Sequence, residues 1–111
     1  MQILVAKIAD IEVISLLGSL DPDAAVQLKL KMKTILEANP AKLIFDLSQL
    51  EYTGSAGLRE FFLAAKTLDR SGGKMVCCGV QKEVRRIFDL AGFAMTYPTV
   101  PTFAEAIDKI A

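Results

Sequence analysis

One serine in this chain of 111 residues stands where its hydroxyl could be modified. The apolar run Leu43–Leu47 leads into a polar connection, which delivers Ser55, flanked by Gly54 and Ala56, to the predicted start of an amphipathic helix. A phosphate on Ser55 would lie against the free N–H groups and the positive end of the helix dipole. The pattern indicates a switch at Ser55, although serine also stands at helix starts simply as an N-cap.

The residue types do not indicate catalysis or metal binding. The chain has no histidine, which removes Ser–His and Cys–His catalysis and most zinc sites. Residues 53–57 superficially resemble a nucleophile elbow, but Thr53 replaces the first glycine of that motif. Cys77 and Cys78 are adjacent, within a buried-strand pattern, and are predicted to be buried thiols. We therefore expect no enzyme, no cofactor and no metal site.

Composition points to one domain over residues 1–111, because 52% apolar residues can build one compact core. Thirteen basic and thirteen acidic residues cancel, so a nucleic-acid partner is disfavoured. The one small basic group, Lys82, Arg85 and Arg86, is expected to be a solvated helix face. No apolar run approaches eighteen residues, so we expect no membrane insertion and a cytoplasmic location.

Apolar periodicity predicts strands that alternate with helices. Strands are expected over 2–9, 11–17, 42–47 and 74–80, with a short strand at best over 94–97 and a break at 98–101. Helices are expected from Pro22 to about 39, and over 55–70, 81–90 and 102–110, with Asp21 or Asp23 and Thr102 as caps. This order requires crossover connections, which predicts an α/β fold with a mostly parallel sheet and an N-terminal hairpin. Asp46 fits a structural role and a partner contact equally well.

Three segments in register resemble the STAS domain family over essentially the whole chain. They are Gly18-Ser19-Leu20-Asp21, Leu43-Ile44-Phe45-Asp46-Leu47-Ser48 and Tyr52-Thr53-Gly54-Ser55-Ala56-Gly57-Leu58. The resemblance implies a STAS-like single domain, with a central sheet and about four helices mainly on one side.

Stand-alone members of this size resemble anti-sigma factor antagonists. Such a protein binds an anti-sigma factor, often a serine kinase, and so releases a sigma factor. The kinase phosphorylates a serine at the start of the second helix, and a serine phosphatase reverses the modification. Matching residue by residue places that serine at Ser55. The implied partner-binding residues are Asp21, Gly54, Ser55, Ala56, Gly57 and Leu58, and Asp21 fits a helix cap equally well.

The chain departs from the family pattern at two positions. Gly54 stands where an acidic residue is common, and Ala56 where a second serine is common. The acceptor hydroxyl of Ser55 is retained. The departure motivates an alternative function, a non-cycling STAS scaffold subunit of a transporter ATPase or of a stress-signalling complex.

Overall fold

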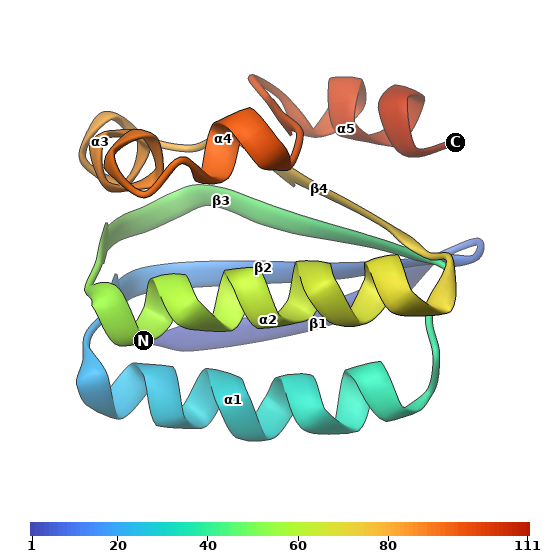
Figure 1. Cartoon of the computed structure of the whole chain (residues 1–111), viewed down its shortest axis with the longest axis horizontal. Helices are drawn as coiled ribbons and strands as arrows, with labels where there is room; N and C mark the ends of the chain where they lie inside the picture. The colour runs from blue at the N-terminus through green and yellow to red at the C-terminus, as the bar shows by residue number, and fades with distance from the viewer.

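A hairpin begins the chain, and three further strands extend the sheet by parallel pairing (Figure 1). The computed structural model describes residues 1–111, with strands in the order β1-β2-β3-β4-β5. The elements are β1 (Gln2–Ile8), β2 (Ile11–Leu20), α1 (Pro22–Glu37), β3 (Lys42–Thr53), α2 (Ser55–Ser71), β4 (Lys74–Cys78), α3 (Lys82–Leu90), α4 (Phe93–Thr96), β5 (Thr99–Val100) and α5 (Phe103–Ile110). The predicted α/β class and the N-terminal hairpin are confirmed. None of the helices is both long enough and apolar enough to cross a membrane.

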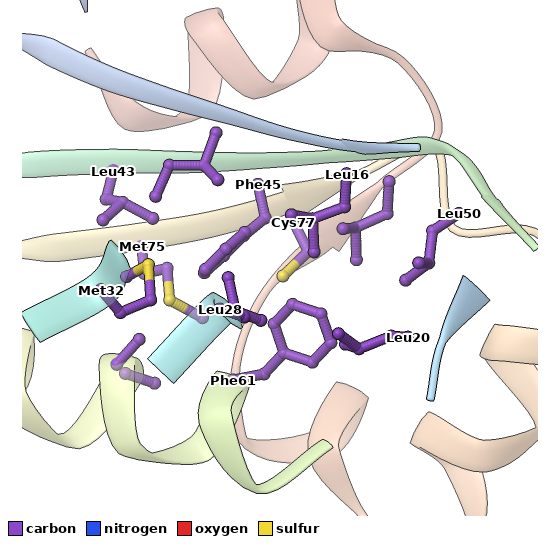
Figure 2. Close-up of a cluster of buried hydrophobic side chains, with 14 of the residues drawn as sticks. Leu16, Leu20, Leu28, Met32, Leu43, Phe45, Leu50, Phe61, Met75 and Cys77 are labelled. Atoms are coloured by element: carbon purple, nitrogen blue, oxygen red, sulfur yellow. The ribbon is translucent and has the colours of Figure 1, made fainter. Parts of the chain in front are cut away.

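Both faces of the sheet are covered, by unequal layers. The main core lies between the sheet and helices α1 to α4, and Figure 2 shows Leu28 and Phe61 pointing from α1 and α2 toward Phe45. The Phe45 and Phe61 rings meet edge to face, with centroids 5.0 Å apart. A smaller core on the other face places Ile44 under Ile110 of α5. β3 is therefore buried from both sides, as its apolar run predicts.

β3 is longer than its predicted range of 42–47, because it continues through most of the expected polar connection to Thr53. It has twelve residues beside ten in β2, and two register shifts absorb the difference. Asp46 supports the first irregularity, since its Oδ1 accepts hydrogen bonds from the Ser48 N–H at 3.1 Å and from the Ser48 hydroxyl at 2.7 Å. The structure thus gives Asp46 a structural role within the bend of β3.

The C-terminal part corrects two predictions. Residues 93–96 form helix α4 rather than a strand, and the strand β5 lies at 99–100, where a break was expected. Phe93 explains the helix, because its fully buried ring packs against Phe88 in a tilted arrangement and against Phe62 edge to face, with centroids 4.6 and 4.9 Å away. The chain has five helices rather than four, with α5 alone on the far face.

The basic group on α3 is also corrected in one residue. Arg85 was expected to be solvated, but its Nη1 donates a hydrogen bond to Thr99 Oγ1 at 2.9 Å.

Candidate functional site

Helices α1 and α2 begin side by side, at the edge where β2 and β3 end. Leu20 and Thr53 are register partners at the ends of these parallel strands. The Gly54 N–H donates to the Leu20 carbonyl at 3.1 Å, so the two strand-to-helix junctions are joined. Figure 1 shows both helices starting at the left and running in the same direction. The fold thereby brings Asp21 close to Gly54 and Ser55.

Asp21 caps α1. Its Oδ1 accepts a hydrogen bond from the Ala24 N–H at 2.8 Å, and Pro22 follows it as the first helical residue. A carboxylate there satisfies an otherwise unpaired N–H and complements the positive end of the helix dipole. The cap predicted for Asp21 is confirmed, and its carboxylate is committed to its own helix even though the residue is exposed. A partner contact by Asp21 stays a prediction.

Ser55 does not cap α2, contrary to the expectation from serine's preference for helix starts. The N-cap is Gly54, which has extended backbone angles (φ −86°, ψ −179°) and offers no side chain. Ser55 is already the first helical residue, so its hydroxyl is not in the position from which an N-cap oxygen reaches the N–H groups further along. Ser55 is exposed. Its hydroxyl is therefore free of a capping bond and open to another protein.

The first turn of α2 is an open N-terminus. The earliest helical hydrogen bond runs from the Leu58 N–H to the Gly54 carbonyl at 3.1 Å, which leaves the N–H groups of residues 55–57 without helical acceptors. No acidic residue lies in this turn to offset the positive end of the dipole. Free N–H groups and a positive dipole end favour a negatively charged group. A phosphate carried by Ser55 would sit directly beside them.

Gly57 fixes how closely α2 packs on the end of β2. A Cβ at this position would overlap the Leu20 side chain and would lie 2.7 Å from Thr53 Oγ1. Thr53 is itself buried, and its hydroxyl donates to the Gly54 carbonyl at 3.0 Å. Gly57 is buried, so any contribution to a partner surface comes through its placement of α2. Leu58 is half-buried and packs against the main core.

Tyr52 belongs to the same surface, and the sequence analysis did not single it out. Half of its area is exposed, and its hydroxyl would stand 3.4 Å from a Cβ built on Gly54. Its aromatic ring and phenol group therefore lie beside Gly54, the residue that precedes Ser55. Simple alternation along the strand does not signal Tyr52, because Glu51 and Tyr52 are both exposed between the buried Leu50 and Thr53.

The two cysteine thiols lie inside the protein, as predicted. Cys77 belongs to the main core and Cys78 to the core beneath α5. Burial raises the pKa of the Cys77 thiol far above its usual range, and raises the pKa of Cys78 to about 11, with the nearby Asp46 carboxylate acting in the same direction. Neither thiol can form the thiolate that a nucleophile needs near neutral pH. Asp, Glu and Cys side chains nowhere gather in a group of three that could hold a metal ion.

Known proteins share this sequence pattern. The STAS domain matches residues 2–106 of the chain. BtrV of Bordetella bronchiseptica, which is named as an anti-sigma factor antagonist, is 31% identical over 98 residues that cover 88% of this chain and 84% of BtrV. The chain belongs to the STAS domain family.

Solved structures share the fold. The crystal structure of an anti-sigma factor antagonist from Mycobacterium paratuberculosis is 27% identical, with a TM-score of 0.91 over 98% of this chain and 92% of that one. The phosphorylated form of the Bacillus cell fate determinant SpoIIAA is 22% identical, with a TM-score of 0.79 over 99% of this chain and all of SpoIIAA. At that identity the likeness to SpoIIAA shows a common fold.

Proposed function

We propose that this protein is an anti-sigma factor antagonist whose binding is switched off by phosphorylation of Ser55. Its partner is an anti-sigma factor of the serine-kinase type, and binding releases a sigma factor in the cytoplasm. A serine phosphatase restores the free hydroxyl. One observation carries the proposal: the exposed Ser55 opens a helix that has no side-chain cap. Kinship with BtrV, named as an antagonist, supplies the class of partner.

A phosphate on Ser55 is expected to affect the free protein and its complex with the anti-sigma factor in opposite ways. A phosphoserine carries about −1.5 to −2 charges at neutral pH. Charge at a helix N-terminus contributes about 0.3–1 kcal/mol of stability, so the fold tolerates the modification. In a partner's apolar or acidic surface the same charge is desolvated or repelled, at a cost of several kcal/mol. A loss of about 3 kcal/mol lowers the affinity more than a hundredfold.

The surface around Ser55 is built for contact with another protein rather than for catalysis. Ala56 adds no bulk next to the hydroxyl, and Tyr52 offers an exposed aromatic side chain of the kind enriched at interfaces. The capping carboxylate of Asp21 lies at the neighbouring junction. A kinase can therefore reach the Ser55 hydroxyl, and the phosphate that it adds would block binding of the anti-sigma factor to this same surface.

The decisive experiment incubates the protein with an anti-sigma factor kinase and ATP and maps the modified residue by mass spectrometry. We expect phosphate on Ser55, and none on a Ser55→Ala variant. Ser48 and Ser71 are exposed serines and serve as internal controls within the same chain. Phosphate on either control serine, or no phosphate in a mixture that forms the complex, would remove Ser55 as the switch.

Binding of variants distinguishes the switch from the scaffold alternative that Gly54 motivates. Ser55→Ala is expected to bind the anti-sigma factor constitutively, and Ser55→Asp to bind weakly. Equal affinities of the two variants, together with capture of a transporter or stress-signalling subunit, would favour the non-cycling scaffold.

A further inference from the structure

The outer edge of β1 is an open strand edge. β1 stands first in the strand order, so only one of its two edges is hydrogen-bonded, to β2. Natural sheets usually protect such an edge with proline, with charges or with a bulge. The seven residues of β1 contain no proline and a single charge, Lys7, and their pairing with β2 has no register shift. The edge is therefore regular and unprotected.

Apolar side chains are exposed on both faces of β1. Leu4 and Ile8 are 47% and 45% exposed on the face that α5 covers elsewhere, and Val5 is 40% exposed on the face that α1 covers. Large apolar groups that gather at one edge mark an interaction surface more often than single exposed ones do.

A groove between β1 and α1 extends this surface. It has a volume of about 610 Å³, and its apolar lining comes from Ile3, Val5, Leu30 and Ile35. Leu30 is 65% exposed, although it lies on a helix whose other face packs in the main core. The chain itself leaves both the groove and the strand edge without a partner.

We propose that β1 pairs with β1 of a second copy of this chain, antiparallel about a two-fold axis at Val5. The pairing joins two five-stranded sheets into one. Val5 is the middle residue of β1, so this register gives every β1 residue an opposite number. Leu4 then faces Ala6 of the second copy, and Ile3 faces its Lys7, so the two Lys7 side chains do not oppose one another.

Charge favours a second copy as the occupant. Thirteen basic and thirteen acidic residues leave no net charge, and two copies do not repel one another. A two-fold axis perpendicular to the sheet keeps each face on its own side, so the grooves above Ile3 and Val5 in the two copies become continuous. Pairing of one seven-residue strand is a small contact, of the kind made by weak, transient complexes that bury less than about 1,200 Å². We therefore expect weak association, with a dissociation constant on the order of 100 μM.

Analytical ultracentrifugation from about 10 μM to about 1 mM tests the proposal, because this range brackets the expected dissociation constant. The average mass should rise with concentration toward that of a dimer. Val5→Lys should weaken the dimer at least tenfold. Met95→Lys is the matched control, since it also places a lysine on an exposed apolar site, 91% exposed on α4. It should dimerise like the unmodified protein.

Hydrogen exchange supplies a readout that depends on no variant. Outward-facing β1 amides should exchange more slowly at about 1 mM than at about 10 μM, because dimer pairing gives them acceptors. A protein that stays monomeric at the highest concentration, or a Val5→Lys variant that dimerises as strongly as the Met95→Lys control, would overturn the proposal. The inference does not depend on the function proposed for Ser55.

Discussion

The two helices that begin at the ends of β2 and β3 have nearly the same backbone at their N-caps and different side chains. Asp21 has φ −78° and ψ 179°, and Gly54 has φ −86° and ψ −179°. The Asp21 carboxylate accepts a hydrogen bond from the first turn of α1, whereas Gly54 has no side chain that could accept one from α2. The difference therefore lies in chemistry and not in geometry. At the start of α1 a side chain accepts a hydrogen bond from a backbone N–H, whereas the start of α2 has no side-chain cap and lies beside the exposed Ser55.

The open start of α2 is nonetheless firmly placed. Gly57 lets the helix rest directly against Leu20, and the Gly54 N–H is bonded to the Leu20 carbonyl. A modification at Ser55 therefore occurs on a fixed support. The packing beneath α2 and the missing cap at its end can be tested separately.

The largest stability effect is expected when the support of α2 is disturbed. Gly57→Ala forces a methyl group into the Leu20 side chain, and overpacking of this kind typically costs about 1–3 kcal/mol of unfolding free energy. Urea denaturation measures the loss. Gly54→Ala is the matched control, since its Cβ would meet the Tyr52 hydroxyl at 3.4 Å and the Leu20 carbonyl oxygen at 3.9 Å, both ordinary contact distances. Equal losses in the two variants would show that Gly57 does not set the position of α2.

A pair of alanine substitutions tests directly whether the starts of α1 and α2 differ in side-chain capping. Asp21→Ala removes a formed cap and should cost about 1 kcal/mol of unfolding free energy. Ser55→Ala removes no capping bond and should stay within about 0.5 kcal/mol of the unmodified protein. The unfolding free energies of both variants are measured by urea denaturation under the same conditions. A Ser55→Ala loss as large as that of Asp21→Ala would mean that the hydroxyl caps α2 after all.

Closing the open start should produce a smaller effect. Gly54→Asp gives α2 the kind of cap that α1 has, which should raise the unfolding free energy by a few tenths of a kcal/mol. Added salt should reduce that gain, because part of it is an interaction of the carboxylate with the helix dipole. A salt-independent change, or a loss of stability, would contradict the assignment of Gly54 as the N-cap.

The buried thiols of Cys77 and Cys78 should not react with reagents in solution, in contrast to the exposed hydroxyl of Ser55, which a kinase can reach. Because the folded pKa of Cys78 is about 11 and its ordinary value is 9.0, the native state keeps a proton that the unfolded chain releases between these values. Unfolding free energy should therefore be unaffected by Cys78 below pH 9 and should fall as the pH rises above it. Ellman's reagent at pH 8 should label the native protein only at the rate of unfolding. Rapid labelling would reveal a second accessible nucleophile.

The fold followed from the sequence wherever periodicity was regular. The buried run in β3 and the amphipathic faces of the helices predicted the layers correctly. The end of β3 could not be predicted in the same way, because two register shifts space its buried residues Leu47, Leu50 and Thr53 three apart rather than two. α4 was missed because four residues are too few for a helical period, and the contacts of Phe93 with distant aromatic rings hold it in place.

The place of Ser55 at the start of α2 was predictable from the sequence, whereas the residues that surround it were not. Ser55 could be located from the residues on either side of it, since its exposure depends only on the start of a helix. The burial of Gly57 depends on Leu20, and the nearness of Tyr52 to Gly54 depends on the bulged course of β3. Contacts between segments far apart in sequence leave no local pattern.

The most direct test compares Ser55-phosphorylated and unmodified protein in two measurements, unfolding free energy and affinity for the anti-sigma factor. Phosphorylation should leave the unfolding free energy unchanged or raise it by up to about 1 kcal/mol, because α2 begins as an open N-terminus. The affinity should fall more than about a hundredfold. A phosphorylated protein that binds as tightly as the unmodified one, or that loses its fold instead of its partner, would contradict the account.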